Sequence, residues 1–216
     1  MTGKDQPKAT AFGREDIQIV AQEIAYQGFF RMLRLRLKHR LFAGGWSQVL
    51  TRELFERGHA VAVLPYDPVR DEVVLIEQFR VGAIEHTASP WLLEIVAGIV
   101  EPGESEEEVA RREAEEEAGL TITTLTRALS YLSSPGGCSE RISLFVGEVD
   151  AAQTVSHAGL ASEGEDIRVL RVSRAQAMAW LQAEKIDNAA SVIALQWLEL
   201  NRHRLWPEMR ESGIGD

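Results

Sequence analysis

An acidic segment whose two ends both carry helix signals constrains this chain more than any other feature. Nine glutamates fall between Glu101 and Glu117. Ser105, with Glu108 three residues later, has the spacing of a capping box at a helix N-terminus, and Gly119 is a typical C-terminal stop. The sequence therefore predicts a helix over 105–118.

Small residues recur every four positions on this predicted helix, at Ala110, Ala114 and Ala118. Residues four apart lie on one side of a helix, so the alanines form a stripe. Small side chains let a helix backbone lie close against a sheet. The pattern favours an α/β fold in which this helix packs on strands.

Strand and helix patterns alternate along the rest of the chain. Leucines alternate with Arg and Lys over 29–41, which predicts a half-buried strand with a basic face. HAVAVLPY and EVVLIEQFR, joined by the polar turn 67–71, predict a hairpin. Further predictions are strands over 92–100 and 142–149, a loop of about a dozen residues over 155–166, and helices over 175–183 and 189–199. A soft boundary near Gly58 separates a β-rich N-terminal module, 1–57, from a mixed domain, 58–216.

Composition excludes several classes of protein. The chain carries 33 acidic residues against 23 Lys and Arg, a formal charge of -10, which disfavours a general electrostatic grip on nucleic acid or anionic lipid. Its one cysteine, Cys138, excludes an internal disulfide and a Cys-rich zinc site. Neither an apolar run of roughly 18 to 20 residues nor a signal-like N-terminus is present, so we expect a cytoplasmic protein without a membrane partner.

The glutamates of the predicted helix have two readings. Glu113, Glu116 and Glu117 share one arc of the helix. A like-charge pair at such spacing costs only roughly 0.2 to 0.5 kcal/mol on an exposed helix, so this arc is compatible with an ordinary solvated acidic face. The alternative is a site that awaits a cation. Charge clustering alone does not decide between the two.

The position-specific spacing does favour the second reading. From Gly98 the sequence reads GIVEPGESEEEVARREAEEEAGL, which fits G-x5-E-x7-R-E-U-x-E-E-x-G-U, where U is aliphatic. The fixed positions are Gly98, Glu104, Arg112, Glu113, Glu116, Glu117 and Gly119. In this motif the chain resembles the Nudix hydrolases, which cleave nucleoside diphosphates linked to another moiety. The resemblance implies an α/β/α sandwich with a mixed sheet.

The resemblance also implies a metal site. A loop, helix, loop unit would present oxygen ligands to hard divalent cations, and Mg²⁺ suits such ligands, with Mn²⁺ as a substitute. The motif holds no His or Cys, which argues against zinc. Arg112 and Glu104 would form an ion pair that orients the helix. The implied metal-binding groups are the backbone carbonyl of Ala97 and the side chains of Glu113, Glu116, Glu117 and Glu165.

Further similarities extend over nearly the whole chain and are typical of the bacterial ADP-ribose pyrophosphatase subfamily. They include Pro135, which lies 15 residues after Leu120, and the segments RELFERGH, EQFRVGA, WLLEIVAG, GLASEGEDIRV and IDNAASVIALQWL. This resemblance implies a homodimer whose N-terminal modules swap and complete each other's adenosine pocket. It implies that Phe29 and Phe30 contact adenine, and that the substrate is further bound by Arg52, Glu53, Arg57, Arg80, Ile99, Ser134, Pro135, Gly136 and Glu140.

The loop 155–166 supplies the implied catalytic base. By the resemblance Glu163 accepts a proton from the attacking water, and Glu165 faces the metals from the same loop. A carboxylate on a glycine-flanked loop can close over bound substrate and accept a proton. His157, at the start of this loop, is a weaker candidate, and Cys138 has no hydrolase signature around it.

The resulting prediction is a Mg²⁺-dependent ADP-ribose diphosphatase that releases AMP and ribose 5-phosphate. One rival keeps the chemistry but changes the substrate to another nucleoside diphosphate sugar, such as GDP-mannose, because the motif recognises only diphosphate and metal. A second rival is a non-catalytic sensor that binds ADP-ribose. Such modules usually lose one of the motif acids, whereas this chain keeps them all.

Overall fold

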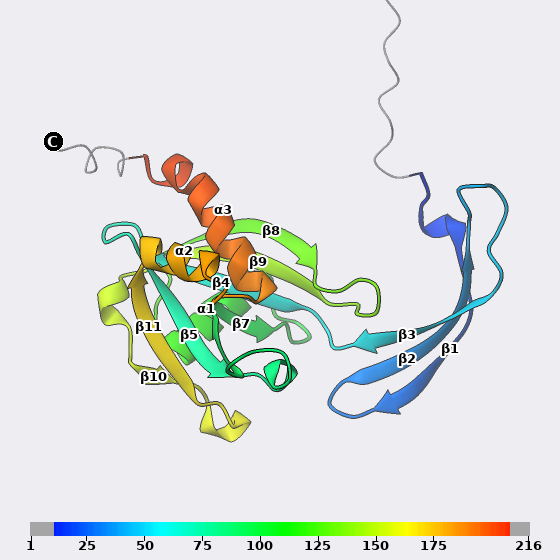
Figure 1. The fold of residues 1–216 in the computed structure, drawn as a ribbon, viewed down its shortest axis with the longest axis horizontal. Helices are drawn as coiled ribbons and strands as arrows, with labels where there is room; N and C mark the ends of the chain where they lie inside the picture. Colours follow the sequence, from blue (N-terminus) through cyan, green and yellow to red (C-terminus); the bar gives the residue numbers. More distant parts are fainter. Residues whose placement is uncertain (1–10, 208–216) are drawn as a thin grey trace, which may run out of the picture. The chain divides into compact units, whose positions relative to one another are not determined.

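The structure, a computed structural model, describes residues 11–207 apart from the side chain of Glu163. The chain separates into two units (Figure 1). The first unit contains residues up to Arg57 together with Ser134–Glu140, and the second contains Gly58–Ser133 and the chain from Arg141 onward. The segment Ser134–Glu140 therefore belongs with the N-terminal residues, although it lies within the range 58–216 in sequence.

The first unit is an antiparallel sheet in the order β1 (Ile17–Gln27), β2 (Arg31–His39) and β3 (Leu50–Glu56). The predicted alternation on β2 is confirmed, because Leu33 is buried while Arg34 is exposed. Leu33 lies opposite Ile24 and Leu54, which makes one face apolar. Arg34 lies on the other face, where its guanidinium is 2.7 Å from the carboxylate of Glu23.

The second unit is built on a mixed sheet. Its strands run in the order β10-β11-β5-β4-β9-β8, with β6 paired to β5 and β7 paired to β4. The pairing of β4 with β9 is parallel, while β4 and β5 form the predicted antiparallel hairpin. The strands are β4 (Ala60–Asp67), β5 (Glu72–Phe79), β6 (Trp91–Glu94), β7 (Val96–Ile99), β8 (Thr124–Leu132), β9 (Arg141–Glu148), β10 (His157–Ala158) and β11 (Ile167–Ser173).

The prediction of one strand over 92–100 is wrong, because this segment forms two strands. β4 and β5 pair only beside their turn, at Tyr66↔Val73 and Asp67↔Glu72. Further from the turn β6 pairs with β5 and β7 pairs with β4, so the segment changes partner and breaks at Ile95. The N–H of Ile95 donates instead to Ser191 Oγ at 3.0 Å.

The predicted helices are present. α1 (Glu106–Ala118) has the expected capping box: Ser105 Oγ accepts from Glu108 N at 3.3 Å, and Ser105 N donates to Glu108 Oε2 at 2.9 Å. Gly119 ends it in the left-handed conformation, at a φ of 67°. α2 (Arg174–Gln182) agrees closely with its prediction, whereas α3 (Ala189–Leu205) continues six residues beyond the predicted 199. Short 3-10 turns lie at η1 (Arg14–Asp16), η2 (Val81–Ala83), η3 (Ala151–Gln153) and η4 (Ala161–Glu163).

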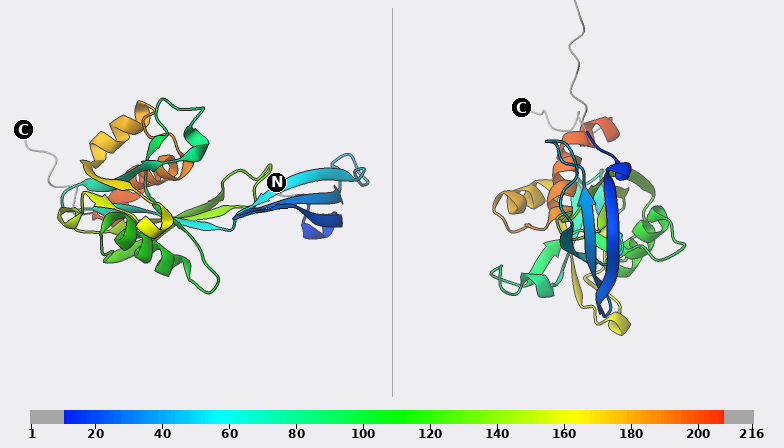
Figure 2. Two further views of the ribbon diagram at one scale, coloured as in Figure 1. Left: turned by 90° about the horizontal axis from the view of Figure 1, so that it is seen from below. Right: turned by 90° about the vertical axis from the view of Figure 1, so that its right-hand side faces the viewer.

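Helices cover both faces of the mixed sheet. On β4, Val61 and Val63 pack in one core with the alanine stripe of α1, while Ala62 and Leu64 pack in a second core with α2 and α3. Figure 2, left, shows α1 (green) on one side of the sheet and α2 and α3 (orange) on the other. The predicted α/β/α sandwich is therefore confirmed. Across residues 11–207, none of the helices has the length and apolar character to span a bilayer.

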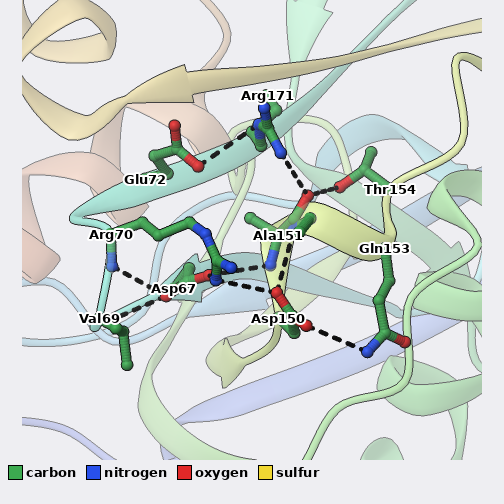
Figure 3. A network of polar contacts seen from close by, with 10 residues as sticks. Asp67, Val69, Arg70, Glu72, Asp150, Ala151, Gln153, Thr154 and Arg171 are labelled. Atoms are coloured by element: carbon green, nitrogen blue, oxygen red, sulfur yellow. Dashed lines mark hydrogen bonds and ion pairs between the residues drawn. The ribbon is translucent and has the colours of Figure 1, made fainter.

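A polar network fixes the turn between β4 and β5 (Figure 3). The carboxylate of Asp67 accepts hydrogen bonds from Val69 N at 2.9 Å, Arg70 N at 3.0 Å, and Ala151 N at 3.0 Å. Arg70 NH1 lies 2.8 Å from Asp67 Oδ2 and 2.9 Å from Asp150 Oδ1. This network ties the hairpin turn to η3.

Candidate active site

The acidic face of α1 lies against β7. Glu117, only 3% exposed, accepts a hydrogen bond at Oε2 from the N–H of Ala97 at 3.0 Å. One turn earlier, Glu113 lies against Gly98, where a Cβ would stand 1.8 Å from Glu113 Oε1. Any side chain at position 98 would therefore displace Glu113. The first glycine of the motif is explained by this close approach.

Arg112 forms ion pairs with several carboxylates of the motif. The expected ion pair with Glu104 is present, with Arg112 Nε 3.1 Å from Glu104 Oε1. Arg112 NH1 also lies 2.8 Å from Glu113 Oε1 and 3.0 Å from Glu116 Oε2. Burial disfavours the charged guanidinium, but these carboxylates more than offset that effect and raise the pKa of Arg112.

The loop after β9 brings a further carboxylate to α1. Gly159 N donates to the carbonyl oxygen of Glu116 at 3.4 Å, and Glu165 Oε2 accepts from Leu160 N at 3.2 Å. The predicted loop, 155–166, contains only the short β10 and η4 among its described residues, broadly as predicted. Glu163 is the last residue of η4, and its side chain lies outside the described part of the structure. Its role as base stays a prediction.

Burial sets the protonation of the α1 carboxylates. It raises the pKa of Glu113 to about 7; the nearby Arg112 opposes this shift, and the charges of Glu116 and Glu165 add to it. Burial likewise raises the pKa of Glu117 to about 8. The hydrogen bond from Ala97 opposes that shift, and the charges of Glu113 and Glu165 add to it. These acids are close enough to repel one another, and their negative charge is incompletely balanced.

The donor chemistry fits a hard cation. Within residues 11–207 no three His, Cys, Asp or Glu side chains are arranged as a metal site. Glu113, Glu116 and Glu117 instead each accept a hydrogen bond from a protein donor. The negatively charged atoms of this cluster that could bind a metal are all carboxylate oxygens, the ligand type that Mg²⁺ prefers. Burial is the main cause of the raised pKa of Glu117, and a cation would offset both this effect and the repulsion from Glu113 and Glu165 that adds to it. The residues could thus hold a divalent metal after modest side-chain movement.

Arg80 follows β5 and faces the same acids. Its positive charge lowers the pKa of Glu117, which places its guanidinium within electrostatic reach. Its Nε and NH2 both lie 2.8 Å from Glu94 Oε2. Glu94 was missed by sequence reasoning. The signal that could have identified Glu94 is the position of an acid at the end of the strand Trp91–Glu94, directly after apolar residues.

The first unit holds an aromatic cluster at the ends of its strands. The rings of Phe29 and Phe30 are 4.7 Å apart, and those of Phe30 and Phe55 are 5.3 Å apart. Arg57 lies over Phe30, with its guanidinium carbon 5.1 Å from the ring centroid. Arg57 Nε is also 3.2 Å from Glu140 Oε1. Phe29 is 88% exposed, so its ring is available to a ligand.

The other predicted binding residues do not belong to this aromatic cluster. Arg52 and Glu53 are adjacent on β3, so their side chains point to opposite faces of the sheet. The turn Ser134–Pro135–Gly136 belongs to the first unit, where the following Gly137 accepts a hydrogen bond from Phe55 N at 2.8 Å. Ile99 belongs to the second unit and pairs with Ala60. The structure thus places the predicted substrate contacts on both units.

Comparisons with known proteins agree with this geometry. The family model described as "NUDIX domain" matches residues 56–208. The chain is 58% identical over 194 residues to a protein of Escherichia coli strain K12 named ADP-ribose pyrophosphatase, covering 90% of this chain and 93% of that protein. It is 50% identical over 212 residues to the Haemophilus influenzae protein of the same name, covering 97% and 98%.

A solved structure gives the same fold. The crystal structure of an ADP compounds hydrolase superposes with a TM-score of 0.68 and covers 90% of this chain and 98% of that one. Its sequence identity is 23%. At this identity the match supports the architecture alone, and the sequence relatives carry the rest.

Proposed function

This chain belongs to the NUDIX family, and we propose that it is a divalent-metal-dependent ADP-ribose pyrophosphatase, which hydrolyses ADP-ribose to AMP and ribose 5-phosphate. The nearly full-length identity to proteins of that name carries the proposal. The intact acidic motif on α1 supports it, because every fixed position of the motif is occupied.

We assign the metal, Mg²⁺ or Mn²⁺ in its place, to the acidic face of α1. Its ligands would be the backbone carbonyl of Ala97 and the carboxylates of Glu113, Glu116, Glu117 and Glu165. When bound, the metal supplies positive charge that stabilises the diphosphate. Glu117 is buried and receives one backbone hydrogen bond, so its other oxygen remains to bind a cation.

The proposed proton acceptor is Glu163. Hydrolysis of a diphosphate requires a water that is deprotonated and aimed at phosphorus, and a carboxylate within hydrogen-bond reach can do both. Gly164, directly after it, has a φ of 72°, so the chain turns sharply at this point. Arg80 would bind the phosphates from the opposite side of the acidic group.

The first unit would bind the nucleoside end of the substrate. Phe29 and Phe30 offer an aromatic stacking face, and Arg57 offers a guanidinium beside it. Arg52 and Glu53, with Arg57 and Arg80, are proposed to hold the ribose and the phosphates of the substrate. The remaining contacts are assigned to the backbone near Ile99, the turn Ser134–Pro135–Gly136 and Glu140.

A homodimer with swapped N-terminal modules is part of the proposal. β1 is exposed along its whole length, although it carries large apolar side chains: Ile19 is 60% exposed and Ile24 is 57% exposed. Contiguous exposed apolar surface of this kind typically marks an interface. Sedimentation equilibrium of the full chain tests the dimer, and cell fractionation tests the predicted cytoplasmic location.

Parallel turnover assays with ADP-ribose, GDP-mannose and NADH test the substrate. We expect the highest kcat/KM for ADP-ribose, with AMP and ribose 5-phosphate as products. A clear preference for GDP-mannose would replace the substrate and keep the chemistry. Binding of ADP-ribose without turnover, with Mg²⁺ present, would instead identify a sensor.

Glu163→Gln tests the base. The variant should bind Mg²⁺ as the wild type does but turn over about 10²- to 10⁴-fold more slowly, since a positioned general base contributes that much. An unchanged kcat would move the role to another residue.

A further inference from the structure

We propose that Glu94 is a positioning residue that holds the guanidinium of Arg80 in the orientation that receives the diphosphate, and that Gln78 in turn holds Glu94. The assignment rests on the proposed pyrophosphatase function. It adds two residues that the acidic motif does not contain.

Three hydrogen-bond donors converge on one oxygen of Glu94. Arg80 Nε and NH2 each lie 2.8 Å from Glu94 Oε2, and Gln78 Nε2 lies 3.3 Å from the same atom. Gln78 is only 6% exposed, and the side chain of Glu94 is 13% exposed. A half-buried carboxylate with this set of partners has little freedom to change its rotamer.

The strand register places these groups on the catalytic face of the sheet. Gln78 is two residues beyond Ile76 on β5, and alternate residues of a strand share a face. Ile76 packs in the core formed with α1. Glu94 lies opposite Ile76 on β6, so it shares that face with Gln78. The α1 face is the one that carries the acidic motif.

The geometry of the pair leaves part of the guanidinium free for substrate. Nε and NH2 form one edge of the planar group, and this edge is the one that Glu94 holds. The remaining N–H donors of Arg80 point along the other edge, where a fork of donors matches a phosphate. The side chain of Arg80 is 44% exposed, so this edge can reach a ligand.

Glu94 also counters a competing attraction. Arg80 is close enough to Glu117 to lower its pKa, so an unrestrained guanidinium would be drawn onto the carboxylates that are proposed to bind metal. Held by Glu94, Arg80 stays beside the acidic group without joining it. A contribution to stability is a poor explanation for the Arg80–Glu94 ion pair, because a partly exposed ion pair adds little to the free energy of folding.

Steady-state kinetics of Glu94→Gln at saturating Mg²⁺ tests the proposal. The substitution keeps the shape of the side chain and removes its charge. We expect KM for ADP-ribose to rise about tenfold while kcat changes by less than about threefold, since a lost charge-assisted contact weakens substrate binding. Glu77→Gln is the matched control, because it removes the 2.7 Å ion pair between Glu77 of β5, the residue before Gln78, and Arg168 of β11, and it should leave KM unchanged.

Arg80→Lys separates positioning from a structural effect. The double variant combines Arg80→Lys with Glu94→Gln. If Glu94 acts through Arg80, this variant should have the same KM as Arg80→Lys alone, because Lys lacks the planar fork of N–H donors that Glu94 orients. A purely structural role would lower the melting temperature and the active fraction with KM unchanged, and this outcome would overturn the proposal. Additive increases in KM would also overturn it. If the wild type itself fails to hydrolyse ADP-ribose, the proposed function fails, and the role of Glu94 fails with it.

Discussion

Two carboxylates of the second unit, Asp67 and Glu117, are about equally buried, at 1% and 3% exposure, yet their pKa values move in opposite directions. For Asp67, burial alone would raise the pKa, but hydrogen bonds from Ala151, Arg70 and Val69 more than offset it and lower the pKa. For Glu117, burial raises the pKa to about 8, and a single hydrogen bond from Ala97 does not compensate for it.

The difference separates a structural acid from a functional one. In the Asp67 network the protein itself supplies the cation, which is Arg70, and the N–H donors (Figure 3). The face of α1 instead has neighbouring acids that repel Glu117, and we propose that a metal ion supplies the balancing charge. Low solvent exposure of an acid identifies neither kind of site. Glu117 lies deeper in the protein than Asp67 and has fewer hydrogen-bond donors, and both differences contribute to the opposite shifts in pKa.

The largest expected effect is on catalysis. Glu117→Gln should reduce kcat about 10²- to 10³-fold, since electrostatic stabilisation of a developing charge is worth that much. The metal-depleted variant should be about as stable as the wild type at pH 7, because the raised pKa of Glu117 leaves its carboxyl largely protonated and the amide is likewise neutral. Glu115→Gln, an exposed substitution on the same helix, is the control and should remain active. A Glu117→Gln variant with nearly normal kcat would contradict the metal assignment.

The second effect is on stability. Asp67→Asn should lower the free energy of unfolding by about 2 to 4 kcal/mol, because the amide cannot accept from Ala151 and Arg70 as the carboxylate does. The kcat of the folded fraction should be unchanged. Urea denaturation combined with activity assays measures both quantities. Asp150→Asn weakens an exposed partner of Arg70 and the cap of η3, and it should cost less because these contacts are exposed to solvent. Equal costs would show that the buried network is unimportant.

The third effect, which is small over any single pH unit, is the dependence of stability on pH. The folded-state pKa values of Glu113 and Glu117 lie above their ordinary value of 4.5, so the folded chain binds more protons than the unfolded chain up to about pH 8. Stability from these groups is present below pH 4.5 and is lost as the pH rises toward 8, by about 1.4 kcal/mol per pH unit at most for each group. Asp67 has the opposite sign, and its contribution is lost as the pH falls.

Urea denaturation in EDTA between pH 5 and pH 8 measures this slope. Glu117→Gln should flatten it relative to the wild type, whereas Asp67→Asn should leave it unchanged. Identical slopes in wild type and Glu117→Gln would show that Glu117 is not the buried acid that titrates.

Local signals allowed α1 to be predicted completely. Ser105, Glu108 and Gly119 act within a few residues of the helix ends, so the sequence alone contains the information. The close approach of Gly98 and Glu113 could not be derived in this way, because it depends on how α1 packs on β7. The motif spacing indicated both residues, but only the packing explains why position 98 is glycine.

Tertiary pairing explains the features that the sequence did not predict. The break at Ile95 follows from the divergence of β4 and β5, which no pattern within 92–100 reveals. β1 lacks a clear prediction because it is exposed throughout, so no alternation of apolar and polar residues marks its faces. The grouping of Ser134–Glu140 with the first unit depends on hydrogen bonds between Phe55 and a turn some eighty residues later.

Calorimetric titration of Mg²⁺ into EDTA-treated, dialysed protein at pH 7, in two buffers of different ionisation enthalpy, is the most direct test of this account. We predict that the wild type binds Mg²⁺ and releases protons, because cation binding lowers the raised pKa values of Glu113 and Glu117. Glu117→Gln should bind more weakly and release fewer protons. Failure of the wild type to bind Mg²⁺, or binding that is unaffected by Glu117→Gln, would contradict the account.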